Sequence, residues 1–414
     1  MKILNVKFIK YLYLSSIGLL SLSCQAIKQT EKADSPPDNT ALATIAFQQK
    51  QKQSFNFGKV LFSNQFAAAR ANAFRQENDS VFSVLVAPEN SPINPSPWYA
   101  FKVWSAGEQP IYIKLKYEGT KHRYNPQISS NGQTWSYVGN VQLNAQESEA
   151  FFKLPVTQDT LLVAAQEIIS AASSYQWMDS LSQMPFLRKQ IIGQSILGKP
   201  IVALHSTGSS GKKLVVVLSR QHPPEVTGYM AMQSFVQATT SATPLAKRFR
   251  KAYELVVIPM INPDGVDEGN WRHSAAGVDL NRDWDVFKQP ETSAVKLFLL
   301  KKLATQKAKV VFALDFHSTY SDVFYTNETS QPTNSPGFTK KWLNAFGKAI
   351  PGFEANIKPS DNGGNVSKSW FSRELGADAL TYEVGDDTPR RVLKMKGRIA
   401  AETMMTLLLQ EEQN

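Results

Sequence analysis

Apolar runs alternate with amphipathic segments in the second half of the chain. The pattern predicts strands at Leu214–Leu218, Leu255–Ile261, Val310–Phe316 and Ala379–Tyr382. It predicts helices near Tyr229–Ala238, around Ala294–Leu303 and over Val392–Leu409. Strands that are apolar throughout and lie between helices are typical of a sheet covered on both faces. We therefore expect residues 167–414 to form an α/β domain around a largely buried sheet.

The first half of the chain has a different pattern, with short β-like runs between turn signals. The runs are Val81–Val86, Trp98–Trp104, Ile111–Tyr117, Phe151–Val156 and Thr160–Val163. Pro95-Ser96-Pro97 and Asn131-Gly132 are turn signals between them. Short strands separated by turns favour a small antiparallel β-sandwich. We expect this domain to cover residues 51–166.

The N-terminus has the pattern of an export signal. Lys2, Lys7 and Lys10 precede the apolar stretch Tyr11–Ser23, which is too short to span a bilayer comfortably. Cys24, the single cysteine, follows at once in a context that resembles a bacterial lipoprotein cleavage site. We expect residues 1–23 to be a signal peptide and Cys24 to carry a lipid anchor on the cell envelope. The alternative is an ordinary signal peptide with a coincidental cysteine.

Composition and charge further restrict the class of protein and its binding partners. Residues 24–50 are polar and rich in Pro, Gln, Lys, Ser and Thr, which predicts a flexible tether. The chain of 414 residues is 42% hydrophobic and 19% charged, as expected for a globular protein with two domains. Its formal net charge is +10, but no basic run with interleaved aromatic residues indicates nucleic-acid binding. A single cysteine excludes an internal disulfide framework.

Four polar clusters follow or end the predicted strands of the second domain. They are Arg220-Gln221-His222-Pro223-Pro224-Glu225, the stretch from Asn262 through Trp271-Arg272 to Asp279-Leu280-Asn281-Arg282, Asp315-Phe316-His317-Ser318, and Thr381-Tyr382-Glu383-Val384-Gly385. Open α/β sheets place their functional sites at the carboxyl ends of strands. The four clusters are therefore expected to meet in one site.

The residue types in these clusters suit metal-assisted hydrolysis. His222 and Glu225, three residues apart on a turn into a helix, can both face one cation. Two histidines, one carboxylate and an open fourth position form a known catalytic zinc arrangement. Zinc in such a site polarises a carbonyl and acidifies a water molecule. A separate carboxylate can accept the proton of that water, and an arginine can stabilise the developing oxyanion.

Taken together, these residues resemble the zinc carboxypeptidase family that includes carboxypeptidases A and B. The resemblance runs from about Phe186 to the C-terminus and includes the lead-in stretch Gly193–Ile201. It implies a mixed sheet flanked by helices and one Zn²⁺ per chain. It also implies the following roles: zinc ligands His222, Glu225 and His317, general base Glu383, oxyanion-stabilising Arg272, substrate-carboxylate ligands Asn281 and Arg282, and Asp279 as the partner of the first zinc histidine.

Within that family, the chain is most similar to the cytosolic carboxypeptidases of the tubulin-deglutamylase type and their bacterial relatives. Those proteins carry a β-sandwich before the catalytic domain. His222-Pro223-Pro224-Glu225 is similar to their "HPGE", and Arg373-Glu374-Leu375-Gly376 to their "REMG". Two features depart from carboxypeptidases A and B: Pro224 replaces the arginine before the zinc glutamate, and the stretch 357–364 contains no tyrosine.

Lys368 is the candidate residue for side-chain selection. It lies six residues before Glu374, where deglutamylase-type relatives carry a basic residue in the pocket for the terminal side chain. A lysine at a pocket base would favour a terminal Glu or Asp. The alternative is that Lys368 points to solvent, as most lysines do.

The function predicted from the sequence is zinc-dependent removal of C-terminal residues from peptides or proteins. Two alternatives stay open: a zinc amidase acting on cell-wall peptides, and a non-catalytic surface-binding lipoprotein that keeps the fold. The intact set His222, Glu225, His317 and Glu383 argues against the non-catalytic alternative. Oligomeric state cannot be read from the pattern.

Overall fold

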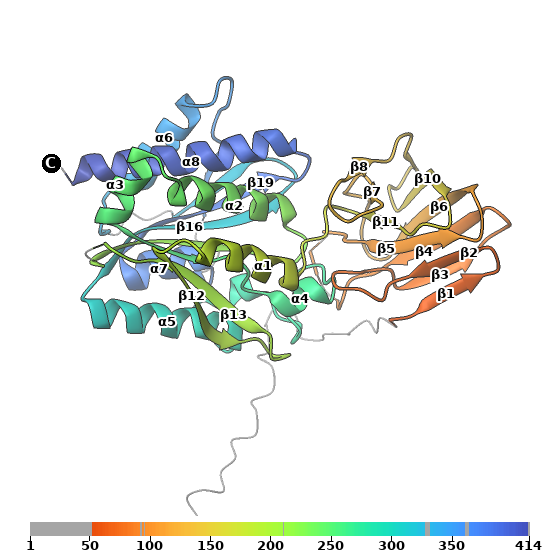
Figure 1. The fold of residues 1–414 in the computed structure, drawn as a ribbon, viewed down its shortest axis with the longest axis horizontal. Coiled ribbons are helices and arrows are strands. Elements are labelled where there is room, and N and C mark those ends of the chain that lie inside the picture. Colours follow the sequence, from red (N-terminus) through yellow and green to blue (C-terminus); the bar gives the residue numbers. More distant parts are fainter. Residues whose placement is uncertain are drawn as a thin grey trace, which may run out of the picture.

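A computed structural model describes residues 52–412, apart from positions 92, 95, 210, 328–331 and 361–363 (Figure 1). The predicted signal peptide 1–23, the anchor residue Cys24 and the tether 24–50 lie outside the described residues. Among the helices that the structure describes, none is both long enough and apolar enough to cross a membrane.

The N-terminal unit packs two β-sheets against each other (Figure 1). The first has the order β1 (Ser54–Phe57), β2 (Val60–Ser63), β5 (Ala100–Ser105), β11 (Leu161–Ala164), β7 (Gln127–Ser129), β8 (Ser136–Tyr137). The second has the order β3 (Ala73–Gln76), β4 (Val81–Val86), β6 (Gln109–Tyr117), β10 (Glu149–Val156), β9 (Gln142–Leu143). The described pairs are antiparallel except β4 and β6, which run parallel and depart from the expected pattern.

Alternating side chains explain why these strands form a sandwich. In β6, Ile111, Ile113 and Leu115 are buried, while Tyr112 and Lys114 between them are only partly covered. A period of two places one apolar row on the inner face of a sheet. The inner faces of the two sheets supply the apolar core of this unit.

The second unit contains a mixed sheet of eight strands among the described residues. Its order is β12 (Leu187–Gln194), β13 (Pro200–Ser206), β15 (Glu254–Ile258), β14 (Lys213–Ser219), β16 (Lys309–Thr319), β19 (Asp378–Gly385), β17 (Val323–Thr326), β18 (Ile357–Pro359). The central strands β15, β14, β16 and β19 are parallel. The predicted α/β class with helices around a mixed sheet is therefore confirmed.

Helices cover both faces of this sheet (Figure 1). One face carries α1 (Ala171–Ser182), α2 (Val226–Thr240), α3 (Pro244–Ala252), α6 (Phe338–Lys348) and α8 (Arg390–Glu411). The other carries α5 (Pro290–Gln306) and α7 (Ser367–Leu375). The short helix α4 (Pro263–Asp267) and the 3-10 turn η2 (Leu280–Arg282) lie in the long connection after β15.

The apolar strands are buried on both sides, as their composition predicted. In β14, Val215 and Val217 pack in the core under α2 and α8, whereas Leu214, Val216 and Leu218 pack toward α5 and α7. Because both faces of a parallel sheet are covered, every position of such a strand must be apolar. In β14 the polar residues Lys213 and Ser219 stand at the two ends, and Ser219 leads into the segment that carries His222.

Parallel register brings the polar clusters together at one edge of the sheet. Ser219, at the end of β14, lies opposite Phe316 of β16, and His317 lies opposite Glu383 of β19. This edge of the sheet faces the N-terminal unit (Figure 1). Residues from both units can therefore contribute to one cavity.

Candidate active site

His222, Glu225 and His317 form the one cluster of potential metal ligands that the described residues contain. Their ligand atoms all lie within 4.8 Å of one another. His222 and Glu225 lie between β14 and α2, and His317 is near the end of β16. The Glu225 carboxylate is 2.8 Å from Nδ1 of His222 and 2.9 Å from Nδ1 of His317. The structure thus brings together the three predicted ligands.

A glycine allows the helix that follows Glu225 to approach His317. A Cβ atom at Gly228 of α2 would overlap the carbonyl oxygen of His317, so a larger residue cannot pack there. The Gly228 N–H also donates to Oγ of Ser318 at 2.8 Å. The close approach of α2 to β16 fixes the separation of the two ligand-bearing segments.

The second nitrogen of each histidine is bound to a further carboxylate. His222 Nε2 lies 2.9 Å from Asp279, and His317 Nε2 lies 3.0 Å from Asp315. An ionised carboxylate only accepts hydrogen bonds, so each Nε2 carries a proton, and each Nδ1 would present its lone pair to a bound metal ion. Carboxylates in this position orient metal-binding histidines.

This donor set fits a zinc ion. The two Nδ1 atoms and the Glu225 carboxylate face one point, where one cation could accept a lone pair from each of them. Nitrogen and carboxylate oxygen are ligands that zinc accepts, and three protein ligands leave a fourth position for water or substrate. His222, Glu225 and His317 would therefore hold the ion.

The electrostatics of the cluster keep its acceptor groups ionised. Burial alone would raise the pKa of Glu225, but His222 and His317 beside it hold that pKa well below its usual range. Burial would also raise the pKa of Asp279, yet the charge of Arg272 and the hydrogen bond from His222 hold it well below the ordinary value. Both carboxylates are therefore charged at neutral pH.

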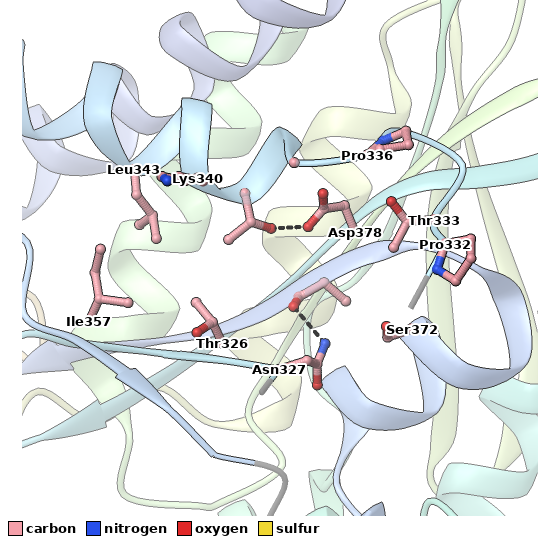
Figure 2. A pocket seen from close by; sticks show the side chains of 13 residues that line it. Thr326, Asn327, Pro332, Thr333, Pro336, Lys340, Leu343, Ile357, Ser372 and Asp378 are labelled. Atoms are coloured by element: carbon pink, nitrogen blue, oxygen red, sulfur yellow. Dashed lines mark hydrogen bonds between the residues drawn. The ribbon is translucent and has the colours of Figure 1, made fainter. Parts of the chain in front are cut away.

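A cavity of about 280 Å³ opens beside this cluster. Its lining includes the other residues that the sequence singled out: Arg272, Asn281, Arg282, Lys368 and Glu383. A second cavity of about 660 Å³ lies near Asp378, between α6, α7 and the end of β17 (Figure 2). Its described lining residues include no histidine or arginine, whereas the groups that suit hydrolysis line the smaller cavity.

Glu383 is positioned as a proton acceptor. It lies on β19 opposite His317, so both side chains project to the same side of the sheet. Burial, together with the nearby charge of Glu225, raises the pKa of Glu383 to about 7. Its buried Oε2 has no hydrogen-bond partner among the described residues, which leaves it available to a ligand in the cavity. A base with a pKa near 7 is well matched to work near neutral pH.

Arg272 and the first histidine share one carboxylate. The Nε atom of Arg272 donates to Oδ2 of Asp279 at 2.7 Å, and Oδ1 of the same residue binds His222. Arg272 lines the cavity, and its side chain is largely but not fully buried. The arrangement fixes the guanidinium beside the metal cluster.

Asn281 and Arg282 are held on the short turn η2. The N–H of Asn281 donates to Oδ1 of Asp279, and its side-chain oxygen accepts from the N–H of Ser367 at the start of α7. Nη1 of Arg282 donates to the carbonyl of Asn281 at 2.7 Å. Both residues line the cavity, so the structure places the predicted carboxylate-binding pair there.

Lys368 lies in the wall of the same cavity rather than in solvent. Only 2% of the residue is exposed. Its Nζ donates to Oδ1 of Asn327 at 3.2 Å and to the carbonyl oxygen of Ser360. The alternative in which this lysine points outward is not the conformation of the structure.

Sequence reasoning missed several residues of the cavity. Asn94, Ser96 and Arg123 come from the N-terminal unit, and Tyr325 comes from β17. Arg123 forms an ion pair with Asp386 at 2.7 Å, just beyond β19. Burial and the charge of Glu383 raise the pKa of Tyr325. No local pattern marks these side chains, because only the packing of distant segments brings them to the site.

Comparison with known sequences gives a family match over the region that holds this site. The sequence profile described as zinc carboxypeptidase matches residues 174–388. Cytosolic carboxypeptidase 6 of Caenorhabditis elegans is 24% identical over 287 residues, which cover 63% of this chain and 62% of that protein. Cytosolic carboxypeptidase 2 of Danio rerio is 33% identical over 141 residues, or 32% of this chain and 19% of that protein. The chain thus spans less than two thirds of these relatives.

Solved structures show the same fold over most of the chain. A metallo-carboxypeptidase from Burkholderia cenocepacia superposes with a TM-score of 0.71 at 18% identity, covering 86% of this chain and 100% of that one. One from Pseudomonas aeruginosa, in complex with (2-guanidinoethylmercapto)succinic acid, gives 0.67 at 19% identity, with coverage of 84% and 98%. The N-terminal unit is therefore included in the similarity.

Proposed function

Because the chain belongs to the zinc carboxypeptidase family, we propose that it is a zinc-dependent enzyme that removes C-terminal residues from peptides or proteins. One observation carries the proposal. The cluster of His222, Glu225 and His317 opens into the same cavity as Glu383, Arg272 and the Asn281–Arg282 pair. These groups supply the metal site, the base, an oxyanion contact and a binding group for a free carboxylate.

The bound zinc ion would polarise the scissile carbonyl and make a water molecule acidic. The Glu383 carboxylate accepts the proton of the attacking water and can pass a proton to the leaving amine. The raised pKa of Glu383, about 7, suits both directions of transfer. The guanidinium of Arg272 donates to the oxygen on which negative charge develops. Its Nε atom is meanwhile bound to Asp279, which fixes its orientation.

Recognition of the chain end falls to Asn281 and Arg282. A guanidinium binds a carboxylate through two parallel hydrogen bonds, which a neutral amide end cannot reproduce. The contacts of Asn281 with Asp279 and Ser367 fix the turn that presents this pair. The enzyme should therefore cut the last peptide bond and leave internal bonds intact.

The side chain of the residue removed is proposed to be acidic. Lys368 is almost fully buried in the cavity wall, and Arg282 adds positive charge to the lining, whereas Arg123 and Arg272 are paired with Asp386 and Asp279. A terminal Glu or Asp side chain would match this charge, whereas a terminal Lys or Arg would be repelled.

The export signal and the lipid anchor at Cys24 complete the proposal. They would place the enzyme at the bacterial cell envelope, where peptides of the cell wall are also accessible. That location keeps a zinc amidase acting on such peptides as the second candidate function.

A substrate screen separates these activities. The zinc-loaded protein is incubated with linear peptides that have free C-termini and, separately, with muropeptides, and products are identified by mass spectrometry. We expect single C-terminal residues to be released from the linear peptides and release to stop after chelation. Cleavage of muropeptide amides alone would favour the amidase, and no cleavage of either set would contradict the proposed activity.

A further inference from the structure

The loop that carries Arg272 is held by a carboxylate from the other structural unit. Glu89 follows β4 of the N-terminal sandwich, and only 6% of it is exposed. Its Oε2 accepts the backbone N–H of Trp271 at 2.7 Å. Its Oε1 accepts those of Arg272 and His273 at 2.8 and 2.7 Å. Three short hydrogen bonds from consecutive N–H groups converge on this one carboxylate and fix the backbone of the loop.

Within the described residues, these three N–H groups have no other acceptor. The segment around them belongs to neither a helix nor a strand, so no backbone ladder fixes it. Asn262 and Asn270 of the catalytic unit hold the carbonyl oxygen of His273, but the three N–H groups depend on Glu89, and a buried N–H without a partner is costly. Glu89 supplies the hydrogen-bond acceptor that these three N–H groups need.

Neighbouring contacts reinforce the same segment from the N-terminal unit. Asn90 Oδ1 lies 2.6 Å from Nδ1 of His273. Arg70 donates from Nε to the carbonyl of Gly269 at 2.8 Å and from Nη2 to Asn270 at 3.0 Å. The sandwich therefore binds the loop on both sides of Arg272, at Gly269 and Asn270 and at His273.

Arg272 is thus fixed at two points by two different units. Its backbone N–H is bound to Glu89, and its side-chain Nε is bound to Asp279. Asp279 also binds His222, so the direction of the guanidinium is set relative to the metal cluster. Loss of the backbone contact would let the guanidinium shift, and a displacement of about 1 Å can lower a rate about 100-fold.

We infer that Glu89 is a positioning residue of the active site, through which the N-terminal sandwich aims Arg272 at the reacting carbonyl. The inference rests on the proposed function. On this inference, the N-terminal sandwich affects the rate of the reaction through the position of Arg272. A residue that only joined the two units would instead affect stability without acting through Arg272.

A double-mutant cycle distinguishes the two roles. Glu89→Gln, Arg272→Ala and the double variant are prepared as zinc-loaded full-length proteins, and kcat and KM are measured on one C-terminal peptide. We expect Glu89→Gln to lower kcat by roughly 10- to 100-fold with KM changed less than about threefold. In the Arg272→Ala background, the same substitution should change kcat less than about twofold.

Two further variants keep the test decisive. Asn90→Ala loosens the same loop at His273 and should lower kcat by a smaller factor, even if Glu89→Gln fails to fold. Lys52→Ala removes the exposed ion pair between Lys52 and Glu268, which also joins the units at 2.6 Å, and should leave kcat unchanged. Zinc content and thermal unfolding midpoints are recorded for every variant.

The outcomes separate this inference from the proposed function. Wild-type kcat in Arg272→Ala would contradict the proposed role of Arg272, and the inference with it. A low kcat in Arg272→Ala combined with an unchanged kcat in Glu89→Gln would overturn the inference alone. Equal factors for Glu89→Gln in both backgrounds would likewise show that Glu89 does not act through Arg272.

Discussion

The Nδ1 atoms of His222 and His317 lie 3.2 Å apart, although 95 residues separate them in the chain. A carboxylate bound to Nε2 fixes the orientation of each ring: Asp279 binds His222, and Asp315 binds His317. A zinc ion held between these nitrogens and the Glu225 carboxylate would have three protein ligands.

Removal of one of these rings should therefore remove the metal. We expect wild-type protein to contain about one zinc per chain and His222→Ala to lose most of it, because two ligands hold zinc far more weakly than three. The measurement is elemental analysis after dialysis against metal-free buffer. His205→Ala, on the β13 strand, is the control and should keep its zinc. Full zinc retention in His222→Ala would remove that residue from the metal site.

Substitution of Arg282 should weaken binding of the substrate's terminal carboxylate. Arg282→Lys keeps the charge but cannot form two parallel hydrogen bonds. We expect kcat/KM on a free C-terminal peptide to fall roughly 10- to 100-fold, mainly through KM. Steady-state kinetics at constant zinc content test this. An unchanged KM would show that another group binds the chain end.

Lys368 should set the preference for the terminal side chain. We expect the wild type to prefer a terminal Glu over a terminal Lys by kcat/KM, roughly 10-fold or more. Lys368→Asp should reverse the order, and Lys368→Met, which keeps length without charge, should abolish the preference. The assay compares peptides that differ only in the last residue. A wild-type preference for basic or aromatic ends that survives both substitutions would exclude Lys368 as the selecting group.

Glu291 should make stability depend on pH, independently of the metal site. It is fully buried in the first turn of α5, and its Oε2 has no partner among the described residues. Burial, with the charge of Asp264 nearby, raises the pKa of Glu291 to about 7 from 4.5. Between these values the folded state binds more protons than the unfolded state, so the free energy of unfolding falls as pH rises.

The expected size of this effect is roughly 2–3 kcal/mol between pH 5 and pH 8. Glu291→Gln cannot ionise, so its free energy of unfolding should fall less over this range by about that amount. Urea unfolding at both pH values measures the difference. Glu374→Gln, at an exposed site, is the control and should behave like the wild type. Parallel pH dependence in wild type and Glu291→Gln would show that Glu291 does not titrate in this range.

The local sequence predicts the part of the site that lies on the sheet. The middle of β14 and most of β16 before Asp315 are apolar, and β19 alternates buried apolar residues before Glu383, so His317 and Glu383 stand out as polar residues near buried strand ends. The parallel register then places them opposite each other. Short-range pattern is sufficient here because the burial of a central strand dictates every one of its side chains.

The connections between strands are less predictable. Asn262-Pro263-Asp264-Gly265 is typical of a simple turn, but in the structure Asn262 caps α4 by accepting the N–H of Gly265. Asp264 in turn accepts from Ser195 and from the N–H of Leu197. Turn chemistry and helix capping use the same residue types, so the local sequence does not distinguish them.

Contacts between the two units could not be read from the sequence at all. Glu89 and Arg272 are 183 residues apart, and Arg123 and Asp386 are 263 residues apart. An acidic residue after a strand is ordinarily a surface residue, and nothing in its neighbourhood reveals a distant partner. The parallel pairing of β4 with β6 escapes the local pattern for the same reason, because strand order depends on tertiary packing.

We propose that Glu383 and a zinc ion together release residues from free C-termini. The most direct measurement incubates zinc-loaded enzyme with one peptide in two forms, with a free or an amidated C-terminus, and follows products by mass spectrometry. We predict stepwise loss of terminal residues from the free form only, and a kcat about 1,000-fold lower for Glu383→Gln with zinc retained. Equal cleavage of both forms would contradict selection of a free C-terminus, and a near-normal kcat in Glu383→Gln would contradict the role of Glu383 as the base.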